Sequence, residues 1–341
     1  MVEYKIIIKN ENDIALGEFH AFIELKYGKR LNNYGMSQIV FSINDEKMGL
    51  LTALRRNSVW IYRDNVLKWS GEMAVREATL DDKAGGRVTL HSYDWLEQLD
   101  HRYTPEAVSY NNTDQGEIFW SEINTTQSQT YGDMGITRGT ITATTPRDRQ
   151  YATQNIMELG INLSNVIDGF DFEITNSKIL NIYSTIGVDR TDSVIFEHGV
   201  NANVTSIIED FKNPVNRAIS TGQVLDPPSI LRVDVDSTED QEIYGIREGL
   251  NTDLDVSESG TLTEKGEALN LKQKAPLMKV DVDILASGPD ISQFALGDTV
   301  LVKVSKGIYN ISEPYRVFEW EVSYDSNNKE KVSVVLAKFN I

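Results

Sequence analysis

Apolar and polar residues alternate along several short segments near both ends of the chain. Ile39, Phe41 and Ile43 occupy alternate positions, and residues 279–286 and 299–305 repeat this pattern. Alternation over about four to eight residues is typical of a β-strand that buries one face. The two ends of the chain are therefore predicted to be built from short strands that each contribute one side to a core.

Turn residues divide these strands into predicted antiparallel hairpins. Asp64 and Asn65 separate the apolar segments 58–63 and 66–69, and both residue types tolerate the positive φ of a two-residue hairpin turn. Gly71 predicts a bulge or a close approach of two backbones. Three further hairpins are predicted, which join residues 72–80 to 87–92, 170–174 to 179–183, and 315–324 to 331–339.

The clearest helical signal lies in the middle of the chain. Thr145 and Pro146 match the N-cap and the first position of a helix, and Ile156 and Leu159 follow at helical spacing. This pattern predicts a helix over residues 149–160. Other short or weak helices are predicted after Asp94, after Asp114, and over residues 48–54 and 258–274.

The length of 341 residues predicts more than one module. The expected fold class is mainly β with some α, with two small antiparallel β-barrel or sandwich domains and a mixed α/β middle. We predict four regions: a first β domain over residues 1–103, a mixed α/β insertion over 104–190, a strand and helix region that completes the β domains over 191–275, and a C-terminal β-barrel over 276–341.

Charge and cysteine content reduce the number of functions that the sequence allows. The chain has 33 basic and 51 acidic residues, a net charge of −18, and no cysteine. A surface that grips nucleic acid needs basic residues, so binding through phosphates is not expected. Disulfides and cysteine-bound metals are excluded. The N-terminal apolar run of three residues is too short for a signal peptide, so synthesis in the cytoplasm is expected.

Motifs for catalysis or cofactor binding are missing from the sequence. His20, His91, His101 and His198 form no HExxH pair, and there is no GxSxG, GxGxxG or phosphate-binding loop. The acidic cluster at residues 234–242 lacks the glycine of a calcium loop and is interpreted as a solvated acidic loop. No catalytic, cofactor or metal-ligating residue is therefore predicted, and the chain is not expected to be an enzyme.

Four segments, taken in order, resemble tail hub proteins of bacteriophages and related injection machines. The first is residues 59–71, which are similar to the first hairpin of such hubs, and the second is the strand and short helix over 87–99. The third is residues 236–248, which contain Tyr244-Gly245-Ile246-Arg247-Glu248, and the fourth pairs 296–300 with 315–317. The resemblance spans about residues 37–339, while residues 104–190 match only in general character.

The resemblance implies a structural role in a virion tail tip. Hub subunits resemble two tail-tube subunits joined in one chain, so a homotrimer would continue and close the hexameric tail tube. Tail tube and distal tail ring proteins, the tape measure protein, and tip or fibre proteins are the implied partners. DNA would pass through the lumen without sticking, and an acidic lining would serve this. No cofactor and no stable membrane insertion is implied, and no lysozyme, peptidase or fibre module is recognised.

Aromatic and charged residues within two of these segments are the candidate subunit interface. Trp60, Tyr62 and Trp69 lie on the first hairpin, and Tyr244 and Arg247 lie in the third segment. Aromatic residues and arginine are common at the centre of protein interfaces. Core packing is the alternative for at least one face of the hairpin.

Three other functions stay open on the sequence alone. A hexameric distal tail ring protein would share a tube-like domain. A β-rich glycan-cleaving enzyme would use acidic residues, and a glycan-binding adhesin would use Trp60 and Trp69. The predicted mixed α/β middle and the Tyr-Gly-x-Arg-Glu segment favour the hub.

Overall fold

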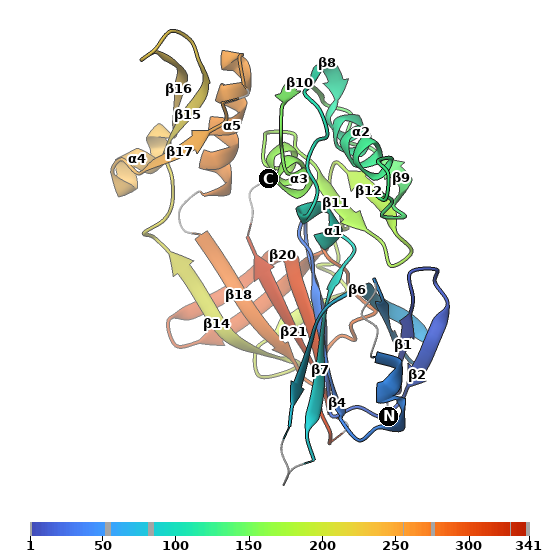
Figure 1. The fold of residues 1–341 in the computed structure, drawn as a ribbon. Helices are drawn as coiled ribbons and strands as arrows, with labels where there is room; N and C mark the ends of the chain where they lie inside the picture. Colours follow the sequence, from blue (N-terminus) through green and yellow to red (C-terminus); the bar gives the residue numbers. More distant parts are fainter. Residues whose placement is uncertain are drawn as a thin grey trace.

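The computed structural model describes residues 2–51, 56–80, 85–254, 256–273, 277–327 and 329–338. Figure 1 shows a large curved sheet in the lower half, a mixed α/β unit above it, and a smaller sheet with a long helix beside that unit. The predicted helix at 48–54 begins within a 3₁₀ turn at Glu46–Leu51, and residues 52–54 lie outside the described residues. Residues 81–84 of the predicted loop, Lys274 of the predicted helix and Phe339 of the predicted strand also lie outside the described residues.

Both ends of the chain contribute to one sheet of 13 strands. Eleven of them follow an open path, in the order β14 (Ala202–Asp210), β18 (Leu277–Ile284), β21 (Glu330–Ala337), β20 (Tyr309–Tyr324), β3 (Glu24–Arg30), β4 (Met36–Ser42), β7 (Arg87–Asp94), β6 (Val66–Thr79), β5 (Ser58–Arg63), β1 (Tyr4–Lys9) and β2 (Ala15–Phe19). In addition, β19 (Thr299–Lys306) pairs with β20, and β13 (Ile195–Glu197) pairs with β19. The mainly β fold class is confirmed, but in the described residues the strands form no closed barrel.

The antiparallel pair of β3 and β20 joins the start of the chain to its end. Its register places Leu25 opposite Tyr324 and Tyr27 opposite Val322, and all four side chains are buried. Residues directly opposite each other share one face of a sheet, so both strands bury the same side. The two predicted β domains are therefore continuous through backbone hydrogen bonds.

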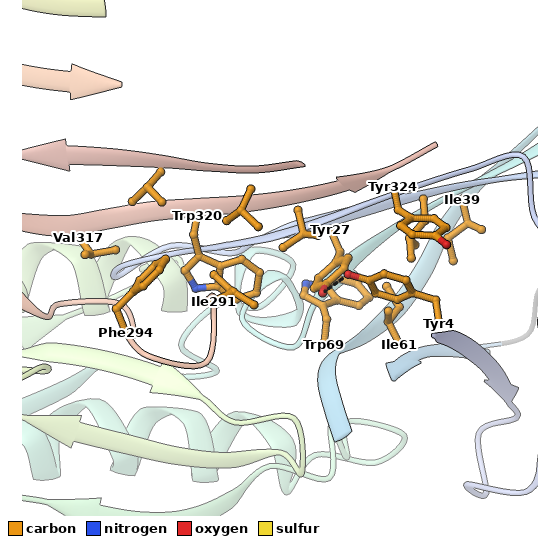
Figure 2. Packing of buried hydrophobic residues seen from close by; sticks show 14 of the residues in the cluster. Tyr4, Tyr27, Ile39, Ile61, Trp69, Ile291, Phe294, Val317, Trp320 and Tyr324 are labelled. Carbon is orange, nitrogen blue, oxygen red and sulfur yellow. Dashed lines mark hydrogen bonds between the residues drawn. The ribbon is translucent and has the colours of Figure 1, made fainter. Parts of the chain in front are cut away.

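One hydrophobic core lies between the main part of this sheet and the strands that curl over it. Tyr4, Tyr27 and Trp69 come from the first part of the chain, and Trp320 and Val332 come from the last. Figure 2 shows the Tyr4 and Tyr27 hydroxyls within hydrogen-bond distance, at 3.3 Å, with Trp320 along the same layer. The core thus crosses the β3–β20 junction, and both ends of the chain depend on it.

The first hairpin folds as its turn residues predict. Asp64 and Asn65 have φ of 51° and 63°, which is the left-handed conformation that this turn requires. At Gly71 a Cβ would lie 2.0 Å from the Tyr93 carbonyl oxygen, so a close backbone approach accounts for the glycine. The predicted hairpins of β6 with β7, of β11 (Asp171–Ile174) with β12 (Ile179–Tyr183), and of β20 with β21 are also present.

The mixed α/β unit has a core of its own. Its elements are α1 (Glu97–Asp100), β8 (Val108–Asp114), α2 (Gln115–Gln127), β9 (Thr137–Ile141), β10 (Pro146–Tyr151), α3 (Ile156–Ser164), β11 (Asp171–Ile174) and β12 (Ile179–Tyr183). Phe119, Leu159 and Phe172 are buried within this core, which is separate from that of the large sheet. The predicted helices after Asp94 and Asp114 are confirmed as α1 and α2.

The helix predicted over residues 149–160 is wrong at its start. Residues 146–151 form β10, which pairs with β8 and buries Arg147 and Arg149. The helix α3 begins at Ile156 instead, where the side chain of Asn155 accepts a hydrogen bond of 3.0 Å from the Glu158 amide. Pairing with β8 therefore overrides the local Thr-Pro signal.

The smaller sheet forms the third part of the structure. It has the order β16 (Ile230–Asp236), β15 (Arg217–Val224) and β17 (Glu248–Thr252), and α5 (Ser259–Lys272) packs against all three strands. The predicted helix at 258–274 is confirmed as α5 within the described residues. The helix α4 (Thr238–Tyr244) follows β16, so residues 234–242 are a strand end and a helix rather than a loop.

Buried polar side chains tie these three parts together. Asp171 of the α/β unit accepts hydrogen bonds from Arg316 of β20 and, at 2.8 Å, from the Asn32 side chain. Arg147 is buried and forms an ion pair with Glu264 of α5. The division of the chain at residues 103, 190 and 275 stays a prediction, although these ties fall between the predicted regions.

Asp94 fixes the end of β7 from the interior. Its carboxylate accepts hydrogen bonds from the Gly35 amide at 2.8 Å and from the Leu96 amide at 3.1 Å. Burial raises the pKa of Asp94 to about 6, against smaller opposing effects from Lys29 and the two amides. A carboxyl with a raised pKa binds a proton more tightly in the folded state. Its contribution to stability therefore weakens as pH rises from about 4 towards 6 and above.

A cluster around Arg63 links the N-terminal hairpin to the C-terminal strands. The guanidinium, whose side chain is 10% exposed, donates to Glu330 at 2.9 Å and to Asp290 at 2.7 Å. Tyr4 donates a hydrogen bond to the same Glu330 carboxylate. Hydrogen bonding to Glu330 raises the pKa of Arg63, so the arginine is charged throughout the working pH range.

Replacing Arg63 with alanine is expected to lower the free energy of unfolding by about 3 kcal/mol, because Glu330 then remains partly buried without its cation. Arg30→Ala is the matched control, since it removes an ion pair with Glu319 that is largely open to solvent. It should cost less than about 1 kcal/mol. Urea unfolding measures both values, and equal losses for the two variants would contradict a stabilising role of the cluster around Arg63.

Candidate functional site

Two of the four histidines lie beside carboxylates at the surface of the described residues. His20 and His101 are exposed and lie 2.7 Å from Glu18 and Glu97, respectively. Within the described ranges, no group of three or more histidine or acidic side chains is arranged to hold a metal ion. No helix among them is long and apolar enough to span a membrane.

One face of the large sheet is turned away from the core and carries charged side chains. We call it the polar face and define it by five ion pairs across and along β18, β21, β20, β3, β4 and β7. They are Lys26–Glu321, Arg30–Glu319, Arg87–Glu24, Lys279–Asp281 and Lys331–Asp283, with N–O distances of 2.9 to 3.9 Å. Each pair brings one positive and one negative charge, so the charges of these ten residues cancel.

Part of the excess of acidic over basic residues lies in the smaller sheet and the segments next to it. Residues 225–258 contain ten acidic and two basic residues. Asp234 pairs with Arg232 at 2.7 Å and Asp236 with Arg217 at 2.6 Å, and these arginines lower the pKa of the two carboxyls. The cluster at 234–242 is thus partly neutralised by Arg232 of the same strand and by Arg217 of the neighbouring strand β15, and the second pairing was not evident from the sequence.

Trp60 and Tyr62 share the outer side of β5. Both are half-buried, and lysines from β1 cover their rings: the Lys9 ammonium lies 3.4 Å from the Trp60 ring centre and that of Lys5 lies 5.1 Å from the Tyr62 ring centre. Trp60 also packs against the core of the α/β unit. Their part in a subunit interface stays a prediction.

Trp69 has a different environment from the other two aromatic residues of the hairpin. It is fully buried, and its indole N–H donates to the Gly28 carbonyl oxygen at 3.1 Å. Figure 2 places it between Tyr27, Tyr4 and Ile61. Trp69 therefore packs in the core of a single chain. It could affect a subunit interface only indirectly, by holding the hairpin in its conformation.

Tyr244 and Arg247 lie far from the hairpin, at the end of α4 and just before β17. Tyr244 is half-buried, whereas Arg247 is exposed. Gly245 between them has a φ of 70°, which explains the glycine in this segment. The predicted interface residues therefore form two separate groups rather than one patch, and their contact with a neighbouring subunit stays a prediction.

A cavity of about 310 Å³ at the β3–β20 junction was not predicted from the sequence. Its lining includes Lys29, Lys68, Phe172, Phe294 and Trp320. Lys29 lies opposite Trp320 in the β3–β20 register, on the core side of the sheet. A lysine at an inward position of an alternating strand is the only sequence signal that could have indicated this cavity.

Comparisons with solved structures identify the fold. A tail protein from Neisseria meningitidis has a TM-score of 0.67 at 10% identity, over 98% of this chain and 97% of that one. The 43 kDa tail protein of prophage MuSo2 from Shewanella oneidensis reaches 0.63 at 11% identity, over 97% of both chains. The prophage tail protein gp18 from Listeria monocytogenes reaches 0.62 at 14% identity, over 98% of this chain and 94% of that one.

These likenesses cover 97% to 98% of the chain and so extend to the α/β unit, where the sequence resemblance was only general. No protein-family model matches the chain, and no curated protein matches it significantly. The chain therefore has the fold of phage tail proteins, and the resemblance seen in its sequence is confirmed at the level of fold.

The different environments of Trp69 and Trp60 predict losses of stability of different size on alanine substitution. Trp69→Ala should lower the free energy of unfolding by about 4 kcal/mol, because it empties a buried site and leaves the Gly28 carbonyl without its donor. Trp60→Ala should cost about 1 kcal/mol, mainly through the lost contact with Lys9. Chemical denaturation measures both, and a greater loss for Trp60→Ala would contradict this assignment.

Proposed function

We propose that this chain is a structural subunit of a phage tail tip, in which three copies form a hub ring. The supporting observation is that strands from both ends of the chain form one continuous sheet. Each copy would then contribute two β modules side by side, and three copies would present six modules to a hexameric tail tube. The two modules differ, so each copy would meet the next through unlike surfaces, which close into a ring.

The polar face is the surface that we assign to the lumen. Its ion pairs present alternating charges, so a passing polyanion would meet neither a basic patch that holds it nor a purely acidic wall. This modifies the expected mechanism of DNA passage, since charge balance replaces an acidic lining. The tail tube, the distal tail ring, the tape measure protein and tip or fibre proteins are the proposed partners within the virion.

Two of the alternative functions are less well supported. A glycan-binding adhesin would need an open ring face at Trp60 or Trp69, but Lys9 covers the first and the core encloses the second. A glycan-cleaving enzyme would need a carboxylate pair set in a cleft, and the carboxylates of the polar face are engaged with lysines and arginines. The proposed role is therefore structural and without catalysis.

The number of copies in the assembly separates the hub from the distal tail ring. Native mass spectrometry and sedimentation of the purified chain should give a species of three times 38.4 kDa at micromolar concentration. Six copies would support the distal tail ring instead. A chain that stays monomeric over the whole accessible concentration range would contradict both ring proposals.

A further inference from the structure

The cavity at the β3–β20 junction is basic in an otherwise acidic protein. We call it the basic cavity and define it by Lys29, Lys68, Trp320, Phe172, Ile291 and Phe294 among its lining residues. Figure 2 shows Trp320 beside Ile291 and Phe294, which form its apolar side. Arg30 also lines it but pairs with Glu319, and the lining carboxylate of Glu173 accepts a hydrogen bond of 3.3 Å from Asn181.

Three polar groups at this cavity form no close ion pair or hydrogen bond within the described part of the chain, although Lys29 acts on the buried Asp94 carboxyl over a longer distance. Neither Lys29 nor Lys68 has a carboxylate within 4.0 Å. Trp320 is only 9% exposed, yet its indole N–H donates no hydrogen bond to any described residue and is not sealed from solvent. Two half-exposed ammonium groups and one solvent-accessible N–H beside an apolar wall suit an occupant that brings acceptor oxygens and an apolar surface.

A segment with this chemistry projects from another part of the same chain. Glu239, Glu242 and Ile243 lie three and four positions apart in α4, and therefore on one face of the helix. Ile243 is 70% exposed, and the two glutamates are exposed with no ion pair to any described residue. Single exposed apolar side chains are common on protein surfaces, so this segment is distinguished by the combination of Ile243 with these two unpaired carboxylates on one helix face.

We propose that the basic cavity of one copy receives the outer face of α4 from the next copy. Glu239 and Glu242 would face Lys29 and Lys68, while Ile243 would pack against the apolar side of the cavity. A carboxylate oxygen would accept the hydrogen bond that the Trp320 indole N–H offers. The two surfaces differ, so the contact is heterologous and runs in one direction around a ring. This inference rests on the proposed ring and specifies one of its contacts.

Cross-linking in this cysteine-free chain tests the contact directly. The double variant Lys29→Cys/Glu242→Cys, treated with a short bismaleimide, should give covalent dimers and trimers on a denaturing gel. The matched control is Lys26→Cys/Glu242→Cys, because Lys26 lies three residues away on β3 but points to the polar face. Equal cross-linking in the two variants, or cross-links only within single chains, would overturn the proposal.

Charge exchange provides a second and independent measurement. Lys29→Glu/Lys68→Glu should raise the dissociation constant of the assembly by about tenfold or more. Adding Glu239→Lys/Glu242→Lys should restore much of the affinity, because the opposite charges face each other again. The control Lys212→Glu/Lys329→Glu changes the net charge equally at exposed positions outside the cavity and should have little effect. Absence of rescue by the second pair would count against the contact.

The outcomes separate this inference from the proposed hub. If the chain forms a trimer without the specific cross-links, and if charge exchange does not change its dissociation constant, the contact is rejected and the proposed hub is retained. A hexamer that shows both effects would support the contact and reject the trimeric hub. A chain that is monomeric at all concentrations would reject both.

Discussion

The pairing of β3 with β20 is the constraint on which the rest of the structure depends. It brings strands that are separated by almost the whole chain into one ladder and merges their buried faces into one core. The Arg63 cluster and the contact between Arg316 and Asp171 then fix the loops and the α/β unit around this junction. Pairing over such a separation carries a large loop-closure cost, and the shared core offsets it.

This arrangement would let a single chain supply two units of the proposed ring. The first module contributes β1 to β7, and the second contributes β13, β14 and β18 to β21. The intervening segments leave the sheet and form the α/β unit and the smaller sheet, which stand to one side of it in Figure 1. The charged side chains of the polar face therefore remain partly exposed within the chain, which the proposed lumen would require.

The extent to which the sequence predicted this structure depended on the range of the signal. Local patterns located the strands at both ends, the turn at Asp64 and Asn65, and the helix α5, because alternation, turn chemistry and capping act within a few residues. The Thr145-Pro146 signal failed, since pairing of β10 with β8 is a tertiary effect. The merging of two expected barrels into one sheet depended on the contact of β3 with β20, which no local pattern encodes.

The candidate surfaces were predictable to a smaller degree. The hairpin 58–69 and the segment around Tyr244 were chosen for their aromatic residues, but burial separates Trp69 from Trp60 and Tyr62. The basic cavity combines Lys29, Lys68 and Trp320 from three strands, so it exists only after folding. The charge balance of the polar face likewise depends on which strands are neighbours, whereas the net charge of −18 describes only the whole chain.

Native-state hydrogen exchange most directly tests the claim that the two ends of the chain form one cooperative sheet. Amides of β3 and β20 should lose protection together with those of β7 and β21, at the denaturant concentration of global unfolding. Earlier exchange of β3 and β20, with β7 and β21 still protected, would contradict the claim, because the two modules would then be stable separately and joined only weakly.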